Sequence, residues 1–231
     1  GFDQEAFLAL VDELTRDEKR ETAKRENIYL DTNSVVASLQ SERTNQSTLY
    51  IRTDAPKDSE EKQCITARMI ANALKKRLFK KLRSNTGYDY SPNCVYEVGP
   101  ILSTFALYTQ VGYKNAYKAL EIMLREMEDI KENGLTKREI EHLRINLKTT
   151  EMMSTSDTQR RAEMNGYTML TEGRLYTFTH FMGDLCSVDN ADIKALARKM
   201  FDREKMSLIA VGNQKLQQRR LEAVFRGRKE I

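Results

Sequence analysis

The sequence predicts an α+β domain with an antiparallel-dominated mixed sheet and helices packed on one face of it. Strand-like segments come as a meander and long amphipathic helical segments are grouped, an order that argues against a doubly wound parallel sheet. Ten glycines, three prolines and 31% charged residues are typical of helix-rich globular proteins. With 231 residues, 40% of them hydrophobic, the chain can bury a core in one large domain or two small ones.

The N-terminal segment predicts an amphipathic helix over residues 2–24. Its apolar residues recur at helical spacing among many charges, and they are Phe7, Leu10, Val11 and Leu14. Residues 35–39 and 48–53 are short, rich in β-branched side chains and separated by a polar link. We therefore expect these two segments to form an antiparallel pair that begins the sheet.

The next helix is predicted to run up to Arg83. Asp58 or Ser59 can cap its start, and Gly87 can take the left-handed conformation that closes a helix C-terminus. One apolar stripe recurs at every fourth position, at Ile70, Leu74, Leu78 and Leu82. The other faces carry Lys75, Lys76, Lys80 and Lys81. Arg83 therefore lies at a helix end, where the helix dipole favours cations.

A β-hairpin is expected after this helix. Tyr90 begins a strand that runs to Val98, and alternation places four side chains on one face: Tyr88, Tyr90, Cys94 and Tyr96. Gly99 and Pro100 turn the chain, and residues 103–111 return as the second strand. One face of that strand carries Phe105, Leu107, Thr109 and Val111.

Helices dominate the remainder of the chain. The first has an apolar face made by Ala116, Leu120, Leu124, Met127 and Ile130, and Gly134 closes it. Thr136 and Glu139 have capping-box spacing, which predicts a second helix over residues 138–171. Asp189 caps a further helix around Ile193, and residues 207–211 form a final buried strand.

Composition limits the partners and the compartment. The net charge of +4 is mild, its 38 basic and 34 acidic side chains are interspersed, and we see no nucleic-acid motif. Cys64, Cys94 and Cys186 lack disulfide-framework or metal-binding spacing, which favours a reducing compartment. No long apolar run and no signal-peptide pattern occur, so we expect no membrane partner. The simplest localisation is cytoplasmic. A chain that starts Gly-Phe-Asp looks like a piece of a larger polypeptide, so the mitochondrial matrix and the periplasm stay open for the parent protein.

The stretch from Arg77 to Tyr90 carries a family resemblance. Arg-Leu-Phe-x-x-Leu-Arg, followed after a glycine turn by Tyr-x-Tyr, resembles the C-terminal homologous domain of the pitrilysin/insulinase family. These are zinc peptidases that include mitochondrial processing peptidase. Residues 112–148 and 155–213 look like the next family segments, in family order and at about family spacing. The resemblance covers most of the chain beyond Ser34.

The chain also departs from the family pattern. Residues 73–76 replace a glycine- and serine-rich link, which favours one unbroken helix. Ser84 and Asn85 replace charged residues, and Asp89 stands where a small residue is usual. We expect these departures to change substrate preference more than the fold.

The resemblance implies a domain organisation. Residues 1–26 would be a linker helix from a preceding domain, with an apolar face that lies exposed when that domain is absent. Residues 27–231 would form a pitrilysin-family C-terminal-type domain, one half-domain of the mitochondrial-processing-peptidase-like fold.

The resemblance implies a function and two site residues. The chain would be the non-zinc half of a clamshell zinc metalloendopeptidase, closing the chamber on a peptide substrate at a zinc ion held by a separate N-terminal domain. The family's catalytic and substrate-binding arginine and tyrosine match Arg83 and Tyr90. A guanidinium can hold a peptide carbonyl, and a phenol can donate to the oxyanion that develops during attack. Tyr88, a second candidate substrate contact, has a spacing from Arg83 that does not match.

The chain itself lacks the family's inverted His-x-x-Glu-His zinc motif. Its two histidines, His142 and His180, are too far apart for one helix turn, and both are expected to be helix-face residues. We therefore expect no metal or cofactor in this chain, zinc in the partner domain, and no peptide hydrolysis by the isolated chain.

Several alternatives stay open. Arg83 could only cap helix carbonyls, with Tyr90 in the core. The chain could instead be an inactive homologue or subunit with a peptide-binding or structural role. It could also be an interaction module that uses the basic face at residues 75–81.

Overall fold

The computed structural model describes residues 3–16, 34–57, 61–84, 87, 92–99 and 102–227. The chain divides into two units, Gly1–Leu30 and Asp31–Ile231. In the first, the predicted helix is observed as α1 (Gln4–Thr15), and residues 17–24 lie outside the described part. The Asp3 carboxylate caps α1 by accepting a hydrogen bond from the Ala6 N–H at 3.1 Å. None of the residues of α1 is buried, and its exposed apolar side chains are Phe7, Leu8, Leu10 and Leu14.

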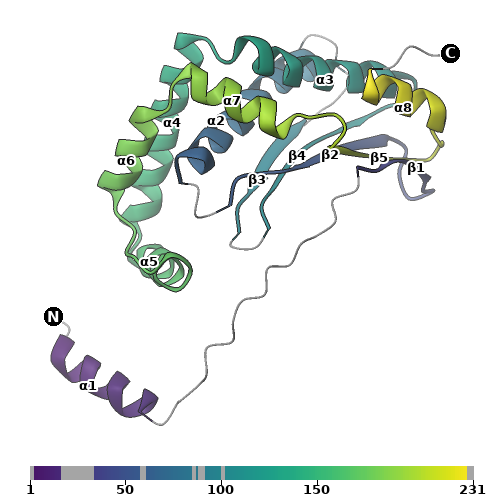
Figure 1. The fold of residues 1–231 in the computed structure, drawn as a ribbon. Coiled ribbons are helices and arrows are strands. Elements are labelled where there is room, and N and C mark those ends of the chain that lie inside the picture. The colour runs from purple at the N-terminus through teal and green to yellow at the C-terminus, as the bar shows by residue number, and fades with distance from the viewer. Residues whose placement is uncertain are drawn as a thin grey trace. The chain divides into compact units, whose positions relative to one another are not determined.

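The second unit is built on a five-stranded sheet in the order β1-β5-β2-β4-β3 (Figure 1). Its strands are β1 (Val36–Gln40), β2 (Ser47–Asp54), β3 (Asn93–Glu97), β4 (Thr104–Val111) and β5 (Ser207–Gly212). Only β1 and β5 pair in parallel, and the other neighbours are antiparallel. The predicted mixed, mostly antiparallel sheet is therefore confirmed, as is the predicted pairing of β3 with β4.

The predicted antiparallel pair of the first two strands is wrong. Both strands form, but β5 lies between them, with Val36 opposite Leu208 on one side and Thr48 opposite Val211 on the other. Residues 41–46 are long enough to cross the gap of about 10 Å that one inserted strand creates. In this position β5 has backbone partners on both edges and buries Leu208 in the core.

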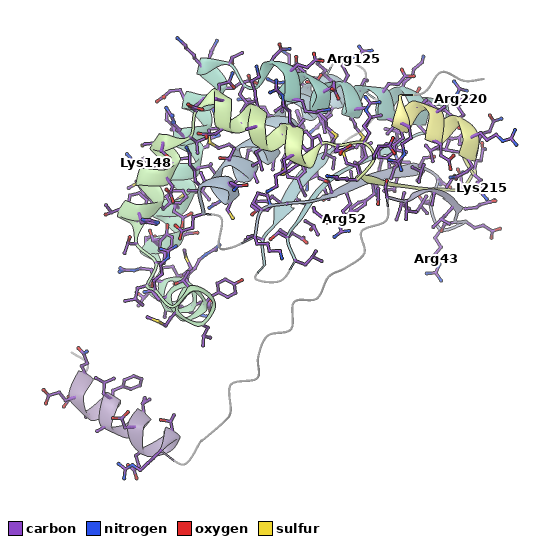
Figure 2. The ribbon with its side chains drawn as sticks, viewed as in Figure 1. Arg43, Arg52, Arg125, Lys148, Lys215 and Arg220 are labelled. Atoms are coloured by element: carbon purple, nitrogen blue, oxygen red, sulfur yellow. The ribbon has the colours of Figure 1, made fainter. Side chains whose placement is uncertain are left out.

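Helices cover one face of the sheet. Along β2, the side chains of Leu49, Ile51 and Thr53 are buried, whereas those between them lie on the opposite face. The covering helices are α2 (Glu61–Leu78), α3 (Ala116–Asn133), α7 (Asn190–Met200) and α8 (Gln218–Arg226), as Figure 1 shows. Arg52 projects from the uncovered face (Figure 2). The predicted arrangement of helices on one face is therefore confirmed.

The described part of this unit also contains α4 (Lys137–Ser156), α5 (Thr158–Glu172), α6 (Phe178–Ser187) and the short 3-10 helix η2 (Tyr113–Asn115). A single helix over residues 138–171 is wrong. Asp157 leaves the helical conformation with φ −82° and ψ 122°, and its carboxylate accepts from the Arg160 N–H to start α5. The predicted capping box at Thr136 and the predicted cap at Asp189 are confirmed, and Asp189 forms a capping box with Asp192. Within the described ranges, no helix has the length and apolar character needed to cross a bilayer.

Candidate functional site

The helix that leads to Arg83 ends in a π-helix. α2 passes without interruption into η1 (Phe79–Ser84), so the unbroken helix expected through residues 73–76 is confirmed. All four residues of the predicted stripe have no exposed surface: Ile70, Leu74, Leu78 and Leu82. The four lysines on the other faces are exposed, as predicted. π-Helical turns are rare and occur frequently at functional sites.

Gly87 closes this helix. Its φ is +65°, in the left-handed region, and its N–H donates to the Arg83 carbonyl at 3.0 Å. A Cβ added to Gly87 would have no atom within 4 Å. Glycine is therefore required for its backbone conformation and not for lack of space.

Arg83 lies half-buried in the last turn of η1. Its guanidinium carbon is 4.8 Å from the centroid of the Phe79 ring, a cation–π geometry that holds the side chain along the helix. The position of Arg83 at a helix end is confirmed. Tyr88 and Tyr90 lie outside the described residues, as do Asp58 and Ser59, so the roles of Arg83 and Tyr90 stay predictions.

Arg77, two residues before η1, holds α2, α3 and α4 together. Its Nε and Nη2 donate to the two Glu139 oxygens at 2.7 and 2.9 Å, and its Nη1 donates to Asp129 at 2.7 Å. Partial burial alone would raise the pKa of Glu139, but hydrogen bonds from Arg77 and Thr136 lower that pKa to about 2. Lys81 forms an ion pair with the buried Glu126. The network fixes α2 and η1 against α3 and α4.

A groove of about 800 Å³ is lined by residues of α2, η1, α3 and α4, and the residues of this ion-pair network form part of its lining. Its α2–η1 side carries Lys75, Lys76, Phe79 and Lys80. Its other side includes His142 and Asn146 of α4, and His142 is exposed as predicted. We call this hollow the lysine-rimmed groove. Sequence reasoning found its lysines but not the hollow, because residues of α3 and α4 form the opposite side.

Glu61, His180 and Asp184 form a cluster that sequence reasoning missed. The His180 Nε2 lies 2.5 Å from a Glu61 oxygen and 3.7 Å from an Asp184 oxygen, and the three ligand atoms lie within 4.8 Å of one another. The sequence shows only that His180 and Asp184 are one helix turn apart. Glu61 is 119 residues from His180, so no local pattern connects it to the other two residues. Arg174 also forms an ion pair with Glu61. With one imidazole, and one carboxylate already paired, the donor set suits an ion-pair cluster joining α2 to α6 better than a zinc site.

Two other reactive groups are held in unreactive states. Burial raises the pKa of the Cys94 thiol well above its ordinary value, which disfavours the nucleophilic thiolate. Burial and a hydrogen bond to Glu151 raise the pKa of Tyr176, whose hydroxyl donates to that carboxylate at 2.7 Å. Glu151 also pairs with Arg68 at 3.3 Å, so this cluster connects α2 and α4.

Two sequence comparisons find similarity to known proteins. A family model described as "Peptidase M16 inactive domain" matches residues 1–147. The curated protein "Uncharacterized zinc protease YmxG" from Bacillus subtilis (strain 168) is 22% identical over 136 residues, which is 59% of this chain and 33% of that protein. The chain therefore spans about a third of the curated relative that it matches.

Solved structures share the fold over nearly the whole chain. A peptidase M16 inactive domain from Pseudomonas fluorescens has a TM-score of 0.78 and 14% identity, covering 94% of this chain and 52% of that one. A protease from Helicobacter pylori has a TM-score of 0.77 and 11% identity, with 91% and 53% covered. A chain of complex III2 from Candida albicans has a TM-score of 0.76 and 11% identity, with 97% and 57% covered. These likenesses concern the fold alone.

Proposed function

This chain belongs to the peptidase M16 inactive-domain family, and we propose that it forms the non-zinc half of a clamshell zinc metalloendopeptidase. In this role it closes a chamber on a peptide bound at zinc in a separate N-terminal homologous domain. That domain is either part of the same polypeptide or a separate subunit. The chain supplies substrate contacts and no metal ligand.

The observation that carries the proposal is the helix end at Arg83. η1 begins two residues after the anchored Arg77 and Gly87 closes the helix with a positive φ, so the Arg83 guanidinium is attached to a rigid element. Substrate-positioning groups work best on such elements, because loss of rotamer freedom on binding is then small. A planar guanidinium supplies several fixed donors to the main-chain carbonyls of a peptide.

In the same proposal Tyr90 donates a hydrogen bond to the oxyanion that forms when water attacks the scissile carbonyl. A phenol donates without carrying a full charge, so it favours the transition state over the ground state. Tyr88 is the second candidate for a substrate contact. These two roles are supported by the match of the stretch 77–90 to the family pattern.

The N-terminal helix fits a linker in this scheme. α1 buries none of its residues and exposes four large apolar side chains along 12 residues. Such a face is stabilised by packing against another surface, and we propose that the surface belongs to the zinc-bearing domain. Residues 1–26 would then be the linker and residues 27–231 the C-terminal-type domain.

Reassembly with a zinc-bearing half tests the proposal. The region upstream of this chain in its parent gene, or a neighbouring gene for a homologous subunit, is expected to encode an inverted His-x-x-Glu-His motif. That half and this chain, each inactive alone, should together cleave an unstructured peptide in a zinc-dependent manner. An intact complex that binds the peptide without cleaving it would favour the inactive-homologue alternative instead.

A further inference from the structure

We propose that the lysine-rimmed groove binds an acidic, extended segment of a partner polypeptide. This binding requires neither zinc nor a reaction at Arg83, so it is independent of the proposed peptidase function. With a volume of about 800 Å³, the groove falls in the range of ligand-sized sites.

Three cations at the rim are available to a ligand. Lys75, Lys76 and Lys80 are exposed, and none of them forms an ion pair with any described residue. Arg77 and Lys81 line the same groove but are engaged with carboxylates of α3 and α4. The uncompensated positive charge is therefore concentrated on the α2–η1 side. An acidic ligand would be attracted to that side.

The floor of the groove is held in place before any ligand arrives. Arg77 bonds to Asp129 of α3 and Glu139 of α4, so these helices are fixed relative to one another. The floor carboxylates are thereby paired. A preformed site loses little conformational entropy on binding, which favours affinity.

The groove also offers contacts suited to a peptide. Phe79 is 42% exposed and provides an aromatic surface for an apolar side chain. Asn72 and Asn146 each use the amide nitrogen within their own helix, to the Arg68 carbonyl at 2.8 Å and to His142 Nδ1 at 3.2 Å. Their amide oxygens can therefore accept hydrogen bonds from peptide N–H groups.

A nucleic acid strand fits the groove less well. Single-stranded binding usually uses several aromatic side chains on which successive bases stack, and the described lining residues include no tyrosine or tryptophan and a single phenylalanine, Phe79. The groove thus favours a peptide.

Fluorescence anisotropy with the 231-residue chain tests the proposal. The probe is a short fluorescein-labelled peptide rich in glutamate with one phenylalanine, and a glutamine version of it serves as the neutral control. We expect saturable binding of the acidic peptide alone, weakened by salt because exposed charges are screened. The combined K75Q, K76Q and K80Q variant should bind about tenfold more weakly.

A matched variant separates the groove from net charge. K118Q, K148Q and K215Q together remove the same charge at exposed lysines that do not line the groove. Figure 2 shows Lys148 and Lys215 at widely separated positions on the domain. This variant should bind within about twofold of the unaltered chain. Equal weakening in both variants, absence of saturable binding, or tighter binding of a single-stranded DNA of equal charge would each overturn the proposal.

Discussion

At the scale of single residues, turnover and stability measured on the same variant separate a catalytic role for Tyr90 from a structural one. Arg83 already has a structural contact, so its removal changes more than substrate binding. In the reassembled enzyme, Tyr90→Phe should lower kcat by about ten- to a thousandfold with little change in Tm, since a phenol that stabilises an oxyanion acts in the transition state. Peptide turnover measures kcat of this variant, and thermal unfolding measures its Tm.

Three further variants serve as controls for this prediction. Tyr88→Phe should have a far smaller effect on kcat. Arg83→Ala should also raise KM, and Arg83→Lys should restore activity only in part, because an ammonium lacks the planar fork. Full activity in Tyr90→Phe would remove its assigned role, and a large fall in Tm would indicate a core residue.

Glu139 makes a predictable contribution to stability against pH. Its pKa is lowered to about 2 from 4.5, so its ionised form stabilises the fold above the ordinary pKa. This contribution is lost as the pH falls from about 4.5 towards 2. Glu139→Gln should cost about 1 to 2 kcal/mol at neutral pH, allowing for solvent screening at this partly exposed group, and less in acid.

Glu141→Gln is the matched control. Glu141 lies on the same helix, is exposed, and faces Arg144 at 3.9 Å. Its replacement should leave the free energy of unfolding within about 0.5 kcal/mol at either pH. Urea unfolding at neutral and acid pH measures both variants. If Glu139→Gln lowered the free energy of unfolding by the same amount at neutral and acid pH, the prediction would be contradicted.

At the scale of elements, Gly87 determines how the π-helix ends. Gly87→Ala places a Cβ at a φ of +65°, which costs about 1 kcal/mol and should lower Tm by about 2 to 4 °C. Gly166→Ala is the control, because Gly166 lies inside α5 with open space around it and helix propensity favours alanine there. Calorimetry should therefore show a lower Tm for Gly87→Ala and a higher Tm for Gly166→Ala. A destabilised Gly166→Ala would point to packing effects instead.

The helices and the hairpin of β3 with β4 were largely predictable from sequence, whereas the position of β5 in the sheet was not. The stripe from Ile70 to Leu82 and the capping box at Thr136 are local patterns, and both are confirmed. The break at Asp157 was hidden because aspartate is tolerated inside helices, and only its cap on Arg160 distinguishes the two cases. The position of β5 between β1 and β2 depends on segments remote in sequence, so local spacing could not reveal it.

The same contrast applies to the site. Arg83 and the glycine that follows it belong to one short stretch, and their arrangement was predictable. The cluster of Glu61 with His180 joins two helices that are remote in sequence. The opposite side of the lysine-rimmed groove comes from α3 and α4. Sites assembled by tertiary packing leave little local pattern to detect.

At the scale of the whole molecule, the isolated chain should bind no stoichiometric zinc and cleave no unstructured peptide. A catalytic zinc site needs about three protein ligands, and the Glu61 cluster offers one imidazole beside a carboxylate already paired with Arg174. Metal analysis after dialysis, with and without His180→Ala, checks this. One tightly held zinc per chain that is lost in His180→Ala would overturn the prediction and assign the metal to this cluster.

The insertion of β5 between β1 and β2 also constrains when the domain can fold. Val35 and Ser207 contact each other across 172 residues, so the pairing of β1 with β5 must wait until β5 has left the ribosome. A nascent chain that ends at residue 147 would have β1 without a neighbour and one edge of β2 open. Such remote pairing slows folding and prolongs the exposure of strand edges. The five-stranded sheet can therefore be completed only when β5 is available to pair with β1 and β2.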